Sequence, residues 1–223
     1  MGTCRGGLAV RRGGAFTREI HDITNAQFRS KFEPDIGRMR GPIGVGVISD
    51  NESQPLLIGS HLGQYAIVTV GVISNNEQLA AKAFGRRTTH FSEMSEGGIN
   101  PTELIATLIN EEATFEEGIQ HAQDVIEGSC SLLLLTDAGL YAARDRWGRT
   151  PLIVGTKDDS TAVASESTAF PNLDYEILKD LGPGEIVLAT ADGVETRKPA
   201  NKQMQMCSFL WIYYGYPSST YEG

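Results

Sequence analysis

The sequence predicts an α+β fold in which antiparallel sheets accompany a separate group of helices. Two observations lead to this expectation. Short apolar runs bounded by glycine lie on both sides of the chain's middle, where two helices with clear start signals are found. This order differs from the regular alternation of strand and helix that produces a doubly wound parallel sheet. Layers of antiparallel sheet with segregated helices are therefore expected.

The first elements are predicted to be a hairpin and three further strands. Gly13 and Gly14 separate the apolar run 8–10 from the run 16–20, which is the pattern of two strands joined by a tight turn. Further strands are expected at 43–48, 56–58 and 65–70, followed by a helix at 75–84.

Two central helices carry clear start signals. Asn100 can cap the first helix, and Pro101 suits its opening turn. Thr114 and Glu117 form a capping box for the second helix, which Gly128 is expected to close. Because the link between the helices is short, we expect them to be antiparallel neighbours.

The remainder of the chain returns to strand patterns. Strands are expected at 131–136, 140–143, 152–154, 162–164 and 185–189, with a turn at 137–139. The last residues, 207–223, combine a β-like aromatic run with turn residues. The aromatic side chains at strand spacing are interpreted as core and domain-interface residues: Phe209, Trp211, Tyr213 and Tyr214. We therefore expect residues 1–206 to form one domain and residues 207–223 to form a junction with another.

Composition excludes several classes of protein. The 223 residues include 28 acidic and 19 basic side chains, for a formal charge of −9. This balance argues against a general nucleic-acid binder, which would present a basic face. No apolar run approaches the length that spans a bilayer, and the N-terminus lacks the apolar segment of a signal peptide. Membrane partners are therefore not expected.

The cysteines and histidines indicate neither a disulfide framework nor a metal site. Cys4, Cys130 and Cys207 are an odd number of cysteines without CxxC spacing, which fits the reducing cytoplasm. The four histidines are scattered, and no glycine-rich phosphate loop is present. We expect no cofactor.

Four strings resemble, in order and spacing, one family of enzymes. Residues 144–152, 164–167 and 181–186 resemble the RDP-G-RPL, ASES and PGE strings of class II glutamine amidotransferase domains. Residues 207–223 are similar to the junction that follows such a domain in amidophosphoribosyltransferases. One such string is weak, but four in sequence are specific. The resemblance extends from about Gly6 to the end of the chain.

The resemblance implies an N-terminal-nucleophile hydrolase fold, a four-layer α/β/β/α sandwich of antiparallel sheets. In this family, an N-terminal cysteine attacks the side-chain amide of glutamine, and the cysteine's own α-amino group serves as the base. The released ammonia passes to a phosphoribosyltransferase domain, which would follow residue 223 and is the implied partner. The family's role is in purine biosynthesis.

The nucleophile implied by the resemblance has no clear counterpart. The family's leading strand, which begins with the cysteine, is not found, and residues 3–10 resemble the hairpin that comes next. Cys4 either occupies a turn or, after removal of residues 1–3, becomes the nucleophile. In the family the leading strand lies inside a sheet. Without it, an open sheet edge and a homo-oligomer are expected.

Three further roles are altered at the matching positions. Ser49 occupies the position of the arginine that holds the substrate's α-carboxylate. Val70 replaces the asparagine of the oxyanion hole, although Gly71 remains. Pro101 replaces the aspartate that holds the α-amino group, and proline offers neither charge nor N–H.

These replacements leave three hypotheses. The first is a degenerate amidotransferase-like domain with a structural or regulatory role. The second is an active glutaminase that uses Cys4. The third is a binding module, because Ser49, Val70 and Pro101 would make a less charged pocket that accepts another small ligand.

Overall fold

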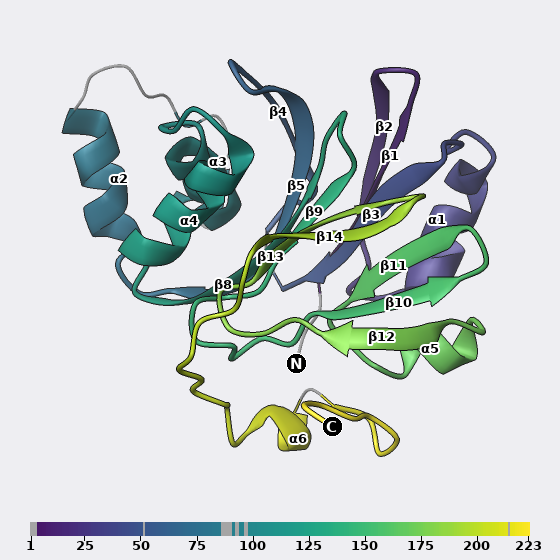
Figure 1. Ribbon diagram of the computed structural model, residues 1–223. Coiled ribbons are helices and arrows are strands. Elements are labelled where there is room, and N and C mark those ends of the chain that lie inside the picture. The colour runs from purple at the N-terminus through teal and green to yellow at the C-terminus, as the bar shows by residue number, and fades with distance from the viewer. Residues whose placement is uncertain (1–3, 51, 86–90, 92–93, 96–97, 214) are drawn as a thin grey trace.

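The computed structural model describes residues 4–50, 52–85, 91, 94–95, 98–213 and 215–223, which form four layers (Figure 1). Three helices cover one face of a six-stranded sheet: α2 (Asn76–Gly85), α3 (Pro101–Ile109) and α4 (Phe115–Val125). The other face packs against two three-stranded sheets. Helices α1 (Phe28–Ile36) and α5 (Ala169–Asn172) lie outside these smaller sheets. The arrangement is the expected α/β/β/α sandwich.

The central sheet is antiparallel throughout. Its strands follow the order β14 (Gly193–Lys198), β13 (Ile186–Thr190), β9 (Leu140–Ala143), β8 (Gly128–Leu135), β5 (Gly63–Ile73) and β4 (Leu56–Ser60). Strand β5 pairs with β8 from Ala66 opposite Leu135 to Ile73 opposite Gly128.

The two smaller sheets are also antiparallel. One has the order β2 (Ala15–Asp22), β1 (Arg5–Arg12) and β3 (Ile43–Ser49). The other has the order β11 (Ser160–Ala164), β10 (Ile153–Lys157) and β12 (Glu176–Asp180). A two-stranded ribbon of β6 (Met94–Ser95) and β7 (Gly98–Ile99) and the short helix α6 (Leu210–Tyr213) complete the described elements.

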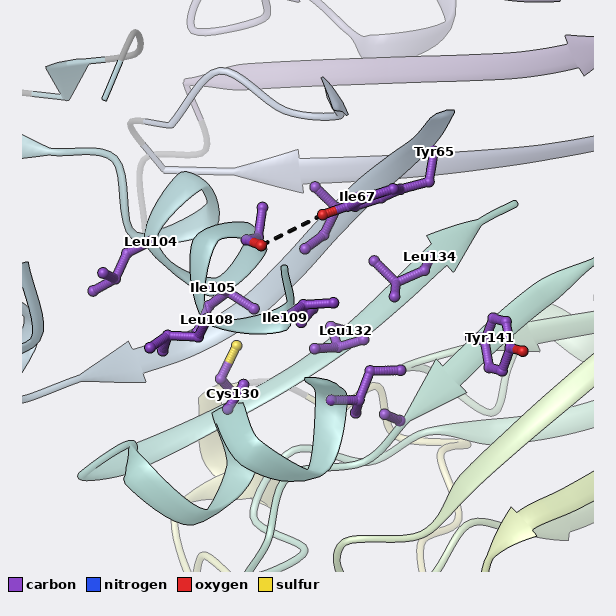
Figure 2. Close-up of a cluster of buried hydrophobic side chains, with 14 of the residues drawn as sticks. Tyr65, Ile67, Leu104, Ile105, Leu108, Ile109, Cys130, Leu132, Leu134 and Tyr141 are labelled. Atoms are coloured by element: carbon purple, nitrogen blue, oxygen red, sulfur yellow. Dashed lines mark hydrogen bonds between the residues drawn. The ribbon is translucent and has the colours of Figure 1, made fainter. Parts of the chain in front are cut away.

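The main core lies between the central sheet and helices α3 and α4 (Figure 2). Alternate residues of β5, Tyr65 and Ile67, point toward α3, where Ile105 and Ile109 are fully buried. The hydroxyl of Tyr65 donates to Oδ1 of Asn110 at 3.0 Å, so the aromatic ring is buried without leaving its polar end unsatisfied.

A second core joins the central sheet to the smaller sheet that contains β1. Ala66 and Val68, which alternate with the residues facing the helices, pack in one cluster with Ala9 and Val45. Strand β5 is therefore apolar on both faces, and this explains its continuous hydrophobic run.

The predicted helix starts are confirmed. The side chain of Asn100 accepts a hydrogen bond from the backbone N–H of Thr102 at 2.8 Å, and Thr114 accepts one from Glu117 at 3.2 Å. These contacts satisfy N–H groups that have no partner within a helix. Figure 1 shows α3 and α4 side by side.

The expected role of Gly128 is wrong. Helix α4 ends at Val125, and Gly128 is the first residue of β8. Its φ is +123°, and a Cβ at this position would lie 2.1 Å from the carbonyl oxygen of Val72. Glycine is therefore required for the close approach of two strands rather than for a helix end.

The C-terminal segment folds back onto the domain. Leu210 and Tyr221 are buried in a cluster with Ile153 and Phe170. The hydroxyl of Tyr221 also donates to the carboxylate of Glu166 at 2.6 Å. Residues 207–223 therefore pack against β10 and α5.

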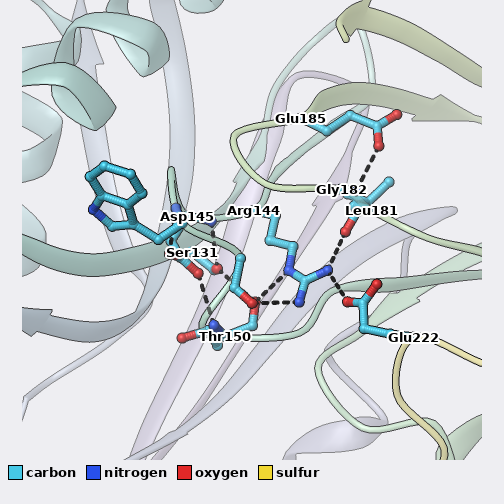
Figure 3. A network of polar contacts seen from close by, with 10 residues as sticks. Ser131, Arg144, Asp145, Thr150, Leu181, Gly182, Glu185 and Glu222 are labelled. Atoms are coloured by element: carbon cyan, nitrogen blue, oxygen red, sulfur yellow. Dashed lines mark hydrogen bonds and ion pairs between the residues drawn. The ribbon is translucent and has the colours of Figure 1, made fainter. Parts of the chain in front are cut away.

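Two expectations for the later part of the chain are wrong. Residues 210–213 form helix α6, so the predicted strand run of aromatic residues is interrupted; Phe209 is exposed, whereas the neighbouring Leu210 is buried. The sequence also suggests an ion-pair turn formed by Arg144, Asp145 and Arg149, and this is the second error. The guanidinium of Arg144 binds Glu222 instead (Figure 3). Arg149 donates to Gln205.

Several elements were not predicted from the sequence, and the longest of them are α1, β12 and β14. Helix α1 includes Pro34 and has no side-chain N-cap, so the usual start signal is missing. Strands β12 and β14 are mostly polar because they lie at sheet edges. Among the helices formed by the described residues, none combines the length and apolar character needed to span a membrane.

Candidate functional site

The predicted pocket positions lie around one hydrogen-bonded network. Its centre is Glu52, whose carboxylate oxygen Oε2 accepts from Nε2 of Gln54 at 2.9 Å and from Oγ1 of Thr102 at 3.1 Å. The hydroxyls of Thr102 and Thr69 are 2.6 Å apart. The network therefore joins the start of α3 to strand β5, through the segment that follows β3.

Ser49 is the last residue of β3, and its hydroxyl is already engaged. It donates to the backbone carbonyl oxygen of Glu52 at 2.5 Å, which closes a short turn. The resemblance places a carboxylate-binding arginine at this position. Instead, a hydroxyl without charge stabilises the turn that carries the acidic side chain of Glu52.

Gln54 fixes this turn to the central sheet. Its Oε1 accepts from the backbone N–H of Thr69 at 2.7 Å, and its Nε2 donates to the carbonyl of Thr69 at 3.2 Å. Gln54 is buried, so these bonds replace the water that its amide would otherwise need. The position of Glu52 is thus set by the fold rather than by a flexible loop.

The electrostatics of the network are acidic. Burial raises the pKa of Glu52, and the nearby charge of Asp50 raises that pKa further, while the hydrogen bonds from Thr102 and Gln54 oppose the shift. Burial also raises the pKa of the Cys130 thiol to about 12, with further contributions from Asp145 and Glu52. Cys130 is therefore a neutral core side chain and not a nucleophile.

Val70 and Gly71 lie on β5, opposite Ser131 and Cys130 of β8. The φ of Gly71 is +149°, and a Cβ there would lie only 1.9 Å from the carbonyl oxygen of Ser129. This contact excludes every other residue, so packing of the sheet is sufficient to explain the glycine. The adjacent Val70 has no side-chain N–H to offer to an oxyanion.

Pro101 is the first residue of α3, next to the capping residue Asn100. Its ring supplies no donor and no charge, and the first turn offers the hydroxyl of Thr102 to Glu52 instead. The acidic side chain beside the start of α3 is therefore that of Glu52, which Thr102 binds, and the residue that opens the helix brings no carboxylate.

Cys4 lies directly before β1, next to Ser49 at the end of the neighbouring strand β3. Its backbone N–H donates to the carbonyl oxygen of Ser49 at 3.1 Å, and its own carbonyl accepts from Ile23 at 2.9 Å. The structure therefore brings Cys4 and Ser49 together, and places Val70 and Pro101 next to the threonines that complete the network. Glu52, Gln54 and Thr102 were not predicted from the sequence.

A second group of ionisable side chains is an ion-pair cluster. Glu19, His21 and Asp35 bring ligand-type atoms within 4.8 Å of one another. However, Arg38 contacts the carboxylates of both Asp35 and Glu19, and His21 lies 2.6 Å from Asp35. A guanidinium therefore supplies the positive charge that a metal ion would bring.

The model of the glutamine amidotransferase domain family matches residues 42–172. The amidophosphoribosyltransferase of Methanocaldococcus jannaschii is 28% identical over 208 residues, which cover 84% of this chain and 43% of that protein. The amidophosphoribosyltransferase of Bacillus subtilis is 28% identical over 174 residues, which cover 76% of this chain and 35% of that protein. The chain thus spans less than half the length of these relatives.

Solved structures agree on the fold. The glutamine phosphoribosylpyrophosphate amidotransferase of B. subtilis superposes with a TM-score of 0.83 at 24% identity, covering 98% of this chain and 48% of that one. A structure described as the allosteric regulatory enzyme of purine biosynthesis superposes with a TM-score of 0.86 at 23% identity. The superposition covers 100% of this chain and 49% of that one. Together with the family match, these likenesses show that the chain belongs to the class II glutamine amidotransferase domain family.

Proposed function

We propose that this chain is an amidotransferase-type domain that no longer hydrolyses glutamine and has a structural or regulatory role. The observation that carries the proposal is the side chain at position 49. Ser49 occupies the position at which the resemblance implies a cation for the α-carboxylate of glutamine, and its hydroxyl donates to the backbone carbonyl oxygen of Glu52. Ser49 therefore brings no positive charge to the substrate's carboxylate, and its one hydroxyl proton is already engaged.

The electrostatic consequence favours loss of glutamine binding. A bidentate arginine attracts a carboxylate by charge and by geometry, whereas a serine hydroxyl is a single neutral donor. At a separation of about 4 Å and the effective dielectric of a protein surface, two opposite unit charges attract by about 4 kcal/mol. Ser49 cannot supply an attraction on this scale.

The oxyanion position supports the same proposal. Val70 cannot donate a hydrogen bond, and removal of one such donor costs about 3 kcal/mol of transition-state stabilisation in enzymes where it has been tested. Gly71, the retained member of this pair, is required by the contact with Ser129 whether or not catalysis occurs. Its presence therefore does not argue for activity.

The role within a larger protein is also a proposal. The curated relatives are about twice as long as this chain and are named amidophosphoribosyltransferases. We infer a phosphoribosyltransferase domain as the partner in the full-length protein, a place in purine biosynthesis, a cytoplasmic location and a homo-oligomeric assembly. In this arrangement the domain would act as a scaffold or a regulatory unit.

Glutamine turnover combined with intact mass tests the proposal. The purified protein is assayed for ammonia release from glutamine, and its mass is measured before and after exposure to a glutamine-mimicking electrophile. We expect no release above the Cys4→Ala variant, and no adduct at Cys4. A chain that begins at Cys4, carries one adduct and loses its turnover on Cys4→Ala would establish an active glutaminase instead.

A further inference from the structure

A cavity of about 540 Å³ lies between strands β3 and β11. Residues 43–46 of β3 form one wall, and residues 160–163 of β11 form the other. Both strands lie on the same face of the central sheet (Figure 1). We call this cavity the β3–β11 groove; it lies outside the Glu52 network.

Both walls of the groove are open sheet edges. Strand β3 pairs with β1 along one side only, and β11 pairs with β10 along one side only. Within the described part of the chain, no strand pairs with the groove side of either. The backbone N–H and C=O groups along an open edge are the groups that another strand would bind.

The floor of the groove is apolar. Leu133, Leu140 and Ala189 of the central sheet line it. From the walls, Val45 and Val163 belong to the same hydrophobic cluster as these floor residues. An occupant would therefore be held by backbone hydrogen bonds at both sides and by apolar contact beneath.

We propose that the β3–β11 groove binds an extended segment of another polypeptide as an added strand that pairs with β3 and β11 together. Each wall exposes four residues to the cavity. At about 3.3 Å per residue in a strand, this corresponds to a paired segment of about four to five residues. Such an addition would join the two three-stranded sheets into one.

The lining defines the chemistry of the segment. Every second side chain would face Leu133 and Ala189, so small apolar residues such as valine or alanine suit these positions. At the rim, Arg11 and Asp137 form an ion pair, and Asp159 adds a further negative charge. A basic residue at one end of the segment would complement this charge.

Backbone recognition distinguishes this groove from a small-molecule pocket. Its volume lies in the range of small-molecule sites, but such sites place a few polar groups at separate points. Here the polar groups come as two facing rows along strand edges. That pattern is the one used when an extended peptide adds to an exposed sheet edge.

Hydrogen exchange measured by mass spectrometry tests the proposal. The probe is a soluble synthetic peptide of alternating valine and threonine, with glycine at both ends and one arginine. We expect exchange to slow at least tenfold in both 43–46 and 160–163 when the peptide is present. The open edge strands β4 and β14 of the central sheet serve as internal controls and should not change.

Two matched variants locate the effect. Thr161 and Glu176 both lie opposite Thr156 of β10, but Thr161 lines the groove, whereas Glu176 lies on the outer edge strand β12. Thr161→Tyr should abolish the protection by filling the groove, and Glu176→Tyr should leave it intact. Thermal unfolding of both variants shows whether each is folded.

Several results would overturn the proposal. These are an absence of protection at peptide concentrations up to the millimolar range, protection of one wall only, or equal protection of β4 and β14. Protection that persists in a folded Thr161→Tyr variant would also place the peptide elsewhere. Protection that rises with protein concentration in the absence of peptide would identify a second copy as the occupant. None of these results depends on whether the chain hydrolyses glutamine.

Discussion

Nη1 of Arg144 lies 2.5 Å from Oε1 of Glu222, so an ion pair joins residues 78 positions apart. The Arg144 side chain is 2% exposed. Its guanidinium also donates to the carbonyl oxygens of Gly148, Thr150 and Leu181 (Figure 3). One buried cation therefore holds the loop after β9, the end of β12 and the C-terminal segment together.

Replacing Arg144 should destabilise the fold strongly. Arg144→Met leaves buried carbonyl groups without donors and Glu222 without its partner, a change that typically costs about 3–5 kcal/mol. Arg149→Met is the matched control, because the guanidinium of Arg149 donates to the side chain of Gln205 at the surface rather than to buried carbonyl groups. Chemical denaturation should show a large loss for the first variant and less than about 0.5 kcal/mol for the second. Equal losses would contradict this account of Arg144.

Glu52 should make stability depend on pH in a predictable direction. Because the folded state raises its pKa above the ordinary value of 4.5, the folded protein binds this proton more tightly than the unfolded chain does. The contribution of Glu52 to stability is therefore most favourable at low pH and declines as pH rises through the folded-state pKa.

Glu52→Gln isolates this effect, since a glutamine oxygen can still accept the hydrogen bonds. The variant should gain stability relative to the parent as the pH rises above 4.5, and the difference should level off once the pH exceeds the folded-state pKa of Glu52. Asp192→Asn, at an exposed turn, serves as the control. A difference between Glu52→Gln and the parent that stays constant from pH 4 to 7 would refute the raised pKa.

Gly71 should tolerate no side chain. In Gly71→Ala, the new Cβ meets the carbonyl oxygen of Ser129 at 1.9 Å, and the positive φ adds backbone strain. We expect a loss of about 3 kcal/mol or more in the free energy of unfolding. Gly59→Ala is the matched control, because nothing lies within 4 Å of its added Cβ, and its stability should be almost unchanged. A mild effect at Gly71 would mean that β5 and β8 are farther apart than described.

Cys130 should resist alkylation in the folded protein. Burial raises its thiol pKa to about 12, so very little thiolate forms at pH 8. Treatment with iodoacetamide should modify no more than Cys4 and Cys207 before denaturation, and all three cysteines afterwards. Peptide mapping by mass spectrometry identifies the sites. Rapid native labelling of Cys130 would show that the strand opens readily.

Local signals in the sequence were sufficient for much of the fold. The capping side chains of Asn100 and Thr114 mark helix starts because they bind the backbone a few residues away. The hairpin turn at Gly13 and Gly14 is similarly local, and both residues have positive φ. Helix α1 lacks such a signal, and its stability depends on packing, as the stacked rings of Phe28 and Phe32 indicate.

The candidate site could be predicted only in part. Family strings located Ser49, Val70 and Pro101, but the side chain that dominates their surroundings is Glu52. Its importance depends on Thr102, 50 positions later in the chain, and on burial by the sheet. Long-range contacts of this kind leave no periodic pattern in the sequence. The same is true of the Arg144–Glu222 pair.

The Arg144 network also has a mechanical consequence. The backbone N–H of Asp145 donates to the hydroxyl of Ser131 at 2.9 Å, and Ser131 pairs with Val70 across the central sheet. A pull on the C-terminal segment must either break the Arg144–Glu222 pair or carry the 144–150 loop with it. The chain's last residues are therefore coupled, through the Arg144–Glu222 ion pair and the Asp145–Ser131 hydrogen bond, to strand β5, which carries Val70.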